Sequence, residues 1–325
     1  MNLGIIDRKL LNLVQSAFPL TREPYADLGR QLSIGTDEVM ELIADLKSKG
    51  LIRLIGPVLD AKSVGYHTTL AAMKVPANHL DKASKAIDQH PGISHGYERN
   101  YDFNVWFTLA LPGEVNSESE LEKIATASGA EAAFSLPALK VFKIGVYFDM
   151  EGDGQGTVAP QHRLPKAPRV KFSATERSII NALQQDLPLL PQPFALMAQQ
   201  AGIEERQFLA ECQSLLQQGV IRRYGAALNH RHAGFTANAM TCWVAPPDAI
   251  VSAGQKLAGL KEVSHCYERK TNPLWRHNLF AMIHGRSRES CEEIARRVSS
   301  ETGFNDCVLL YSTRELKKAR IRYSL

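Results

Sequence analysis

The sequence predicts an α+β protein that is built as a tandem repeat, and three observations support this prediction. The segment SHCYER, Ser264–Arg269, repeats SHGYER, Ser94–Arg99, at a constant offset of 170 residues. Helical and extended patterns follow one another in the same order in both halves of the chain. A stretch rich in glycine and proline, residues 151–171, separates the two copies. The chain therefore contains one structural unit twice.

Each copy is expected to begin with three short helices. In the first copy, Val39, Ile43 and Leu46 have the three- and four-residue spacing of an amphipathic helix, and residues 174–221 repeat the pattern in the second copy. Short extended segments follow at residues 52–60 and 221–229. Three helices and an extended segment are the plan of a winged helix-turn-helix.

The rest of each copy alternates strands and helices in the order βαββαβ. The first strand, the first helix and the last strand are expected at Tyr66–Val75, Asn78–Gln89 and Leu139–Phe148, and again at Phe235–Val244, Asp248–Leu260 and Cys307–Leu316. The SHxYER segment, a further strand and a second helix lie between them. This order is that of a ferredoxin-like domain, an antiparallel sheet with two helices on one face.

The domain boundaries follow from these patterns. We expect a winged helix-turn-helix over 1–60, a ferredoxin-like domain over 61–150, a linker over 151–171, a second winged helix-turn-helix over 172–230 and a second ferredoxin-like domain over 231–325. Since like subunits usually meet through the same surface, the two ferredoxin-like sheets should pair about a pseudo-twofold axis, as in a homodimer.

The composition is that of an ordinary soluble globular protein, with 44% hydrophobic and 22% charged residues. Charged residues interrupt the apolar positions of the first 15 residues, so no signal peptide is expected. There is no run of about 18 apolar residues that could span a membrane. The five cysteines include no C-x-x-C pair, which argues against disulfides or a zinc site. We expect a cytoplasmic protein without a membrane partner.

Helix-turn-helix domains are typical of transcription regulators, but both candidate recognition helices are acidic. A recognition helix needs basic or amide side chains toward phosphates and base edges. Residues 35–47 carry Asp37, Glu38, Glu41 and Asp45 against Lys47, and residues 203–218 carry Glu204, Glu205 and Glu211 against Arg206. We therefore expect no sequence-specific DNA binding.

The SHxYER segments are the first candidate site. If each is a strand, alternation places His265, Tyr267 and Arg269 on one face, and Ser264, Cys266 and Glu268 on the other. The first copy has the same row: His95, Tyr97 and Arg99. A single histidine on such a face is more often structural. Histidine, tyrosine and arginine together, used twice, indicate a site.

A second concentration of polar residues occurs in the second copy alone. Residues 221–235 contain Arg222, Arg223, His230, Arg231 and His232, whereas residues 52–66 of the first copy keep the scaffold and lose most of these side chains. This one-sided loss predicts that the second copy supplies most of the site. Clustered arginines bind carboxylates, and histidines transfer protons near neutral pH. The predicted ligand is a polycarboxylate, and the predicted chemistry is proton transfer.

A helix-turn-helix joined to a βαββαβ domain resembles the Lrp/AsnC family. The paired SHxYER segments, RRYGAALNHRHAGF at 222–235 and WRHNLFAMIHG at 275–285 resemble the siroheme decarboxylases more specifically. Within that family, two halves in one chain look like the fused NirD–NirL type, which is similar to the AhbA–AhbB pair.

The resemblance implies removal of the carboxyl groups of two acetate side chains of siroheme, giving didecarboxysiroheme on the way to heme d1. Such a carbon–carbon lyase needs no organic cofactor and no metal site of its own, because the macrocycle accepts electron density and the iron arrives with siroheme. The implied partners are siroheme, its products and other proteins of heme d1 biosynthesis. Two alternatives stay open: a transcription regulator of the Lrp/AsnC type, and a heme-sensing binding protein.

The candidate residues receive roles on this basis. We expect His230 and His265 to supply protons and Tyr267 to orient the substrate. The residues expected to bind the substrate are Arg222, Arg223, Arg231, His232, Arg269, His95, Tyr97 and Arg99.

Overall fold

The computed structural model describes residues 3–16, 18–145, 150, 171–229 and 237–325. The chain forms two compact units, and each unit combines segments of both sequence repeats. The first unit comprises Met1–Gly65, Tyr147–Gly234 and Tyr323–Leu325, and the second comprises Tyr66–Val146 and Phe235–Arg322. None of the described helices is both long and apolar enough to cross a membrane.

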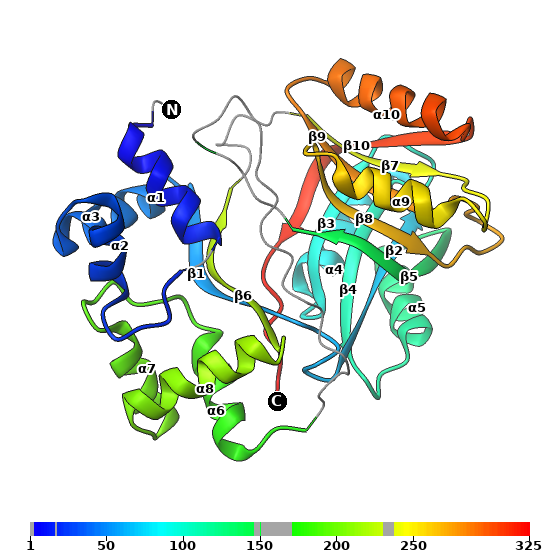
Figure 1. The fold of residues 1–325 in the computed structure, drawn as a ribbon. Helices are drawn as coiled ribbons and strands as arrows, with labels where there is room; N and C mark the ends of the chain where they lie inside the picture. The colour runs from blue at the N-terminus through cyan, green and yellow to red at the C-terminus, as the bar shows by residue number, and fades with distance from the viewer. Residues whose placement is uncertain (1–2, 17, 146–149, 151–170, 230–236) are drawn as a thin grey trace. The chain divides into compact units, whose positions relative to one another are not determined.

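The first unit contains the two predicted three-helix segments (Figure 1). The elements of the first repeat are α1 (Ile5–Ser16), α2 (Pro24–Leu32), α3 (Thr36–Ser48) and β1 (Ile52–Leu59). Those of the second are α6 (Ala174–Leu183), α7 (Pro193–Ala201), α8 (Glu205–Gln217) and β6 (Ile221–Leu228). Proline stands in the first turn of both α2 and α7, where the missing N–H costs no hydrogen bond.

Strands β1 and β6 pair antiparallel and form one two-stranded sheet from the two repeats. Gly56 lies opposite Gly225 in this sheet. A Cβ atom at Gly225 would lie 2.6 Å from the carbonyl oxygen of Val14, so glycine allows the end of α1 to approach the strand. The two winged helix-turn-helix domains are therefore joined through their wing strands, which the repeat alone did not predict.

The second unit contains the two predicted βαββαβ domains. The elements of the first are β2 (Tyr66–Lys74), α4 (Leu80–Gln89), β3 (Ile93–Arg99), β4 (Val105–Pro112), α5 (Ser117–Ser128) and β5 (Ala132–Ile144), with the short helix η1 (Ala77–His79) before α4. Those of the second are β7 (Ala237–Trp243), α9 (Ile250–Gly259), β8 (Val263–Arg269), β9 (Leu279–Gly285), α10 (Arg288–Thr302) and β10 (Cys307–Lys318). The predicted fold class is confirmed.

The eight strands of this unit close into one barrel in the order β10-β3-β4-β2-β5-β8-β9-β7. The closure depends on two long strands. The first part of β5 pairs with β2 of its own repeat, and the part from Ala138 to Ile144 pairs with β8 of the other. Likewise β10 pairs first with β7 and then, from Ser312 to Lys318, with β3. The prediction that the two sheets pair about a pseudo-twofold axis is confirmed.

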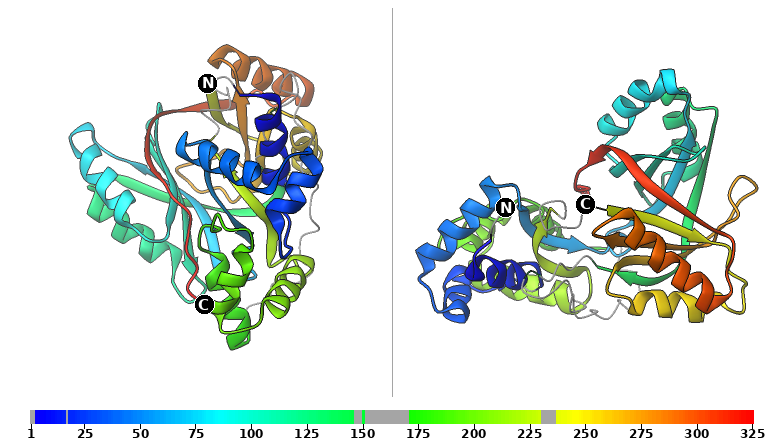
Figure 2. Two further views of the ribbon diagram at one scale, coloured as in Figure 1. Left: turned by 90° about the vertical axis from the view of Figure 1, so that its left-hand side faces the viewer. Right: turned by 90° about the horizontal axis from the view of Figure 1, so that it is seen from above.

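Side chains on the two faces of the barrel wall enter different cores. The outer faces pack against helices, α4 and α5 on one sheet and α9 and α10 on the other (Figure 2). The inner faces form a third apolar cluster drawn from both repeats, with Trp106, Phe134, Trp275 and Phe280 among its largest members. The interior of the barrel is therefore a shared product of the two repeats.

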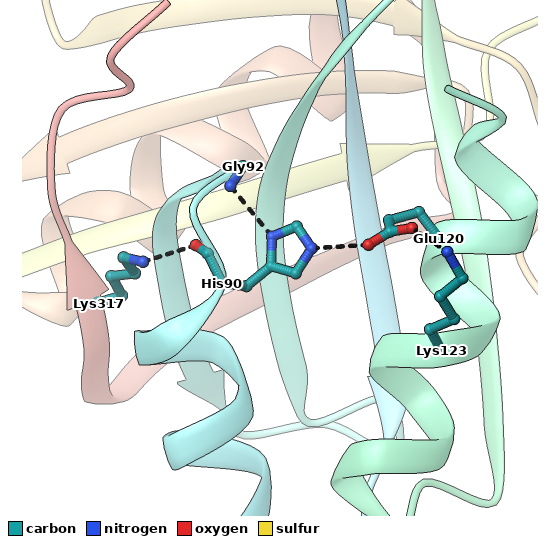
Figure 3. A network of polar contacts seen from close by, with 5 residues as sticks. All are labelled: His90, Gly92, Glu120, Lys123 and Lys317. Carbon is teal, nitrogen blue, oxygen red and sulfur yellow. Dashed lines mark hydrogen bonds and ion pairs between the residues drawn. The ribbon is translucent and has the colours of Figure 1, made fainter. Parts of the chain in front are cut away.

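A polar network on the first repeat helps to hold β10 in place (Figure 3). The backbone N–H of Gly92 donates to Nδ1 of His90 over 3.1 Å, so the proton of the neutral ring is on Nε2, which donates to Glu120. Lys317 of β10 donates to the carbonyl oxygens of Asp88 and His90, at 2.6 and 2.8 Å. This network ties the last strand of the second repeat to the end of α4.

Candidate active site

The predicted row on β8 lies on the inner face of the barrel. The rings of His265 and Tyr267 are stacked with centroids 6.3 Å apart, and the guanidinium carbon of Arg269 lies 4.6 Å from the centre of the Tyr267 ring. Tyr267 pairs across the ladder with Phe280 of the interior cluster. Cys266 instead enters the helix-facing core. The alternation predicted for these residues is confirmed.

The first repeat places its row on the same interior. Tyr97 of β3 pairs with Trp106 of the interior cluster, and the guanidinium carbon of Arg99 lies 5.5 Å from the centre of the Tyr97 ring. His95 is exposed, whereas His265 is half-buried. The barrel therefore carries two related rows, one from each repeat, in unequal surroundings.

The two arginines of these rows are cations with limited exposure: Arg99 is buried and Arg269 is half-buried. Arg99 is 5% exposed and donates from Nη1 to the carbonyl oxygen of Leu310 over 2.7 Å. Arg269 donates from Nη1 to the carbonyl oxygen of Leu136 over 2.9 Å. Among the described residues neither side chain forms an ion pair, and neither Nε has a hydrogen-bond partner. Burial lowers the pKa of Arg99 to about 10 and also lowers the pKa of Arg269, but both groups keep their charge near neutral pH.

A chain of three polar side chains extends from the row on β8. The hydroxyl oxygen of Ser264 lies 2.9 Å from Nδ1 of His265 and 2.7 Å from Nε2 of His284 on β9. Plain alternation would separate Ser264 from His265, as the sequence predicted. The register between β8 and β9 shifts between Val263 and His265, and this bulge brings the hydroxyl to the ring. The prediction that Ser264 is separated from the row is therefore wrong.

The surroundings of His265 favour the neutral imidazole. Its pKa falls to about 3, first because burial disfavours the charged form, and then because positive charge gathers around it. The neighbours that add to this repulsion are His284, His95, Arg269 and Lys143. His265 is therefore a neutral histidine at neutral pH, surrounded by groups that would favour a nearby anion.

Two of the predicted substrate-binding arginines have structural partners in the first unit. Arg222 donates from Nε to Asp60 over 2.9 Å, and a second bond joins its Nη2 to the same carboxylate oxygen. Burial opposes ionisation of Asp60, but the bonds and charge of Arg222, with help from Ser63, outweigh it and lower the pKa of Asp60. Arg223 donates to the carbonyl oxygen of Gln15. Both guanidinium groups thus fasten β6 to neighbouring segments.

Three further predicted residues, His230, Arg231 and His232, lie outside the described residues. Within the part of the chain that the structure describes, no group of three or more histidine, cysteine, aspartate or glutamate side chains is arranged to hold a metal ion.

Sequence reasoning missed Ser264 and His284 as partners of His265. A signal for His284 was available. Val263 pairs with Ile283, and Ile93 pairs with Leu109, so the residue that corresponds to His284 in the first repeat is Ala110. His284 therefore resembles the polar side chains within residues 222–232, because the first repeat has no polar residue at the corresponding position.

Two family models match the chain. Residues 7–53 and 176–222 match the model described as siroheme decarboxylase NirDL-like HTH domain. Residues 63–143 and 232–317 match the model described as AsnC-like ligand binding domain. Each model therefore matches once in each repeat.

Curated relatives match along nearly the whole chain. A siroheme decarboxylase of Hydrogenobacter thermophilus is 36% identical and covers 97% of this chain and 94% of its own length. A siroheme decarboxylase NirDL subunit of Paracoccus pantotrophus is 32% identical, with coverage of 97% and 96%. The siroheme decarboxylase beta subunit of Methanosarcina barkeri is 39% identical over 46% of this chain.

Solved structures agree with these relatives. A crystal structure of the siroheme decarboxylase NirDL has a TM-score of 0.75 and 33% identity, and covers 98% of this chain and 94% of its own. A second, of NirDL in co-complex with an iron-uroporphyrin III analogue, has a TM-score of 0.74 and 32% identity, with coverage of 98% and 95%. With full-length relatives above 30% identity and both family models matched in each repeat, the chain belongs to the siroheme decarboxylase family.

Proposed function

We propose that this protein decarboxylates siroheme at two acetate side chains and releases didecarboxysiroheme for heme d1 biosynthesis. The observation that carries the proposal is the inner face of the barrel, where His265, Tyr267 and Arg269 are stacked in one row. The relative that binds an iron-uroporphyrin III analogue has the same fold over nearly the whole chain.

The arginines of the two rows, Arg99 buried and Arg269 half-buried, suit a substrate with many carboxylates. A buried cation without a counter-ion is unfavourable, and a carboxylate beside it removes that cost. Arg99 and Arg269 each retain a free Nε among the described residues and lie against aromatic rings. We assign them to substrate carboxylates, with Tyr97 and Tyr267 against the apolar macrocycle.

Each decarboxylation consumes one proton. The carboxylate leaves as carbon dioxide, the electron pair of the broken carbon–carbon bond passes into the macrocycle, and the methylene carbon then takes a proton and becomes a methyl group. The protein needs an acid at that carbon and surroundings that disfavour the free carboxylate. We assign the acid to His265, with Tyr267 orienting the substrate.

The remaining predicted residues receive narrower roles. Arg222 and Arg223 hold β6 through Asp60 and Gln15, so we expect their substitution to affect stability first. His230, Arg231 and His232 stay predictions as a further acid and further substrate contacts. His95, on the pseudo-symmetric row, is a second contact with the substrate.

The proposed reaction is that of a carbon–carbon lyase without an organic cofactor. The macrocycle of siroheme accepts the electron density, and its iron enters with the substrate. We place the protein in the cytoplasm, where its five thiols, all free in the structure, stay reduced.

The decisive experiment is anaerobic incubation of the purified protein with siroheme, followed by mass spectrometry of the macrocycle. The expected result is loss of two carboxyl groups as carbon dioxide. Siroheme that binds and is recovered unchanged would indicate a heme-sensing protein instead. Tight, salt-dependent binding to one DNA sequence without decarboxylation would indicate a regulator, which the exposed acidic residues of α3, Asp37, Glu38 and Glu41, argue against.

A further inference from the structure

We propose that Ser264 and His284 form a proton relay that keeps His265 neutral as it gives up its proton during decarboxylation. This inference rests on the proposed function, because it assumes that His265 protonates the substrate carbon. It concerns two positioning residues that hold and pass a proton without touching the substrate.

The relay follows from the number of hydrogen bonds that a serine hydroxyl can donate, which is one. The hydroxyl of Ser264 carries one proton, and it lies within hydrogen-bond distance of two ring nitrogens, at 2.9 Å from His265 and 2.7 Å from His284. Ser264 can donate to one nitrogen alone, so the other nitrogen must donate to it. The three groups therefore form a directed chain, and its direction reverses when one proton moves along it.

One direction of this chain suits the reaction. His284 donates from Nε2 to Ser264, and Ser264 donates to Nδ1 of His265, so the remaining proton of the neutral His265 ring is on Nε2. His284 begins this step as the imidazolium, with protons on both ring nitrogens. When Nε2 of His265 gives its proton to the substrate carbon, Nδ1 of His265 takes the proton of Ser264. Ser264 takes the Nε2 proton of His284, and His284 is left as a neutral ring with its proton on Nδ1. Three protons move and one is consumed, so His265 stays neutral, now with its proton on Nδ1. A proton taken up from solvent at Nε2 of His265 then sends the Nδ1 proton back through Ser264 to His284, which restores the first state for the second decarboxylation.

The charges around His265 explain why a relay is needed. His284, His95, Arg269 and Lys143 all oppose a positive charge on His265, so this ring does not store an extra proton near neutral pH. A second histidine behind a hydroxyl can instead hold the extra proton one hydroxyl away from His265. Removal of two carboxyl groups requires two protons, so the supply must be renewed within one catalytic cycle.

The first repeat supplies a matched control. Ser94 lies 2.9 Å from Nδ1 of His95, in the same geometry as Ser264 and His265, and the register of β3 shifts at the same place. Ala110 stands where the second repeat has His284. The first repeat thus has the hydroxyl of Ser94 and the ring of His95, but it lacks a histidine that corresponds to His284. Ser94 therefore has no second histidine at that position from which it could relay a proton.

The test compares Ser264→Ala, Ser264→Thr, His284→Gln and the control Ser94→Ala in single-turnover decarboxylation of siroheme. We expect Ser264→Ala and His284→Gln to lose about 10²-fold in rate, the lower end of the range for a proton-transfer group. Ser264→Thr keeps the hydroxyl and should keep the rate, as should Ser94→Ala. The affinity for siroheme, measured by absorbance titration, should stay unchanged in all four.

The variant His284→Gln separates proton transfer from simple support. Its side-chain amide would keep a nitrogen donor near Ser264 but could not accept a proton and pass it on. A structural role predicts a normal rate and a normal pH profile for His284→Gln. The relay predicts a lower rate for His284→Gln and a changed dependence of this rate on pH. It also predicts a smaller solvent deuterium isotope effect than in the wild type, because fewer protons move in the rate-limiting step.

The outcomes also separate this inference from the proposed function. If the wild-type protein leaves siroheme unchanged, the function itself is wrong. If His265→Gln keeps the wild-type rate, the acid is another residue and the relay is wrong with it. If His265→Gln is slow while Ser264→Ala and His284→Gln keep the wild-type rate and pH profile, the relay alone is wrong. Loss of rate that matches a loss of siroheme affinity would also reject the relay.

Discussion

His265 and His95 occupy equivalent positions of the two repeats but differ in burial and in their neighbours. His265 is half-buried, bonded to Ser264 and stacked on Tyr267, whereas His95 is exposed and bonded to Ser94. A group that protonates carbon must be held in one position and shielded from water. The proposed acid therefore belongs to the second repeat.

His265→Gln should lower the rate of decarboxylation by about 10²–10⁴-fold, because the ring is the assigned proton donor. His95→Gln should have a much smaller effect on rate. The measurement is a single-turnover reaction that scores the mono- and didecarboxylated products separately. If His95→Gln abolishes turnover while His265→Gln remains active, the site belongs to the first repeat.

The low pKa of His265 also affects stability. A histidine titrates near 6.5 in an unfolded chain, and burial and positive neighbours lower the folded-state pKa of His265 to about 3. Between these values the unfolded chain binds a proton that the folded protein does not. The free energy of unfolding should therefore fall as the pH falls through this window, by up to about 1.4 kcal/mol per pH unit.

His265→Gln should reduce this pH dependence, measured by denaturant unfolding between about pH 7 and pH 5. The comparison with wild type is needed because His277 also contributes. Burial lowers the pKa of His277 too, so it adds a pH dependence of stability with the same sign, and it is unchanged in the variant. An unchanged slope would mean that His265 titrates normally in the folded protein.

At the scale of single residues, the sequence predicted the row of His265, Tyr267 and Arg269. It did not predict the hydrogen bonds that link His265 to Ser264 and Ser264 to His284. Alternation with a period of two correctly placed His265, Tyr267 and Arg269 on one face. It failed at Ser264 because a β-bulge adds a residue to one strand, and the pattern Ser-His-x-Tyr fits a regular strand equally well. The partner of Ser264 comes from β9, which only the tertiary fold brings beside it.

Among the elements, β6 depends on an ion pair between a buried carboxylate, Asp60, and a half-buried guanidinium, Arg222. Asp60 lies just after β1 with its side chain 6% exposed, and it binds Arg222 of β6 and also accepts from the backbone and hydroxyl of Ser63. Removing one partner of a buried pair leaves the other charge without compensation. The pair therefore fastens β6 to the chain segment that follows β1.

Asp60→Ala should lower the free energy of unfolding by about 3 kcal/mol, measured by denaturant unfolding. Lys74→Ala is the control, since Lys74 and Glu131 form a pair whose side chains are 51% and 55% exposed, and its loss should cost less than about 1 kcal/mol. If Asp60→Ala unfolds like the wild type and instead loses siroheme affinity, Arg222 acts on the substrate, as its place in the sequence first suggested.

Most elements were predictable, and the exceptions have physical causes. The last strand of the first repeat was expected at Leu139–Phe148, but β5 begins at Ala132. Pro137 disfavours a strand assignment, because proline lacks the N–H of a ladder bond. In the structure Pro137 is the last residue paired with β2, and Ala138 is the first paired with β8. The proline thus stands where β5 passes from one partner strand to the next.

For the whole molecule, the repeat predicted that the two copies would meet, and the strand ladders show how. Among the described strands, three ladders join the repeats: β1 with β6, β5 with β8, and β10 with β3. Each repeat alone would leave long strand edges unpaired, and such edges associate with other strands. The ladders between the repeats are therefore the contacts that close the barrel.

Residues 1–150 and 172–325, expressed together as separate chains, should assemble into a one-to-one complex that retains siroheme decarboxylation. The physical reason is that every ladder between the repeats can form between separate chains. Linkage adds only a high effective concentration, which reaches the order of millimolar when two binding partners are joined in one chain. Size-exclusion chromatography and the product assay check both parts of this prediction.

Glu315→Pro tests whether the barrel seam is responsible for assembly. Glu315 lies in the part of β10 that pairs with Tyr97 of β3, and a proline there removes the backbone N–H and disfavours a paired strand. We expect this substitution to prevent association of the separate chains while weakening the linked protein less, because linkage keeps the repeats together. Glu315→Ala removes the same side chain but keeps the N–H, and should assemble normally. Two repeats that purify apart as folded monomers would show that these ladders are not needed for either repeat to fold.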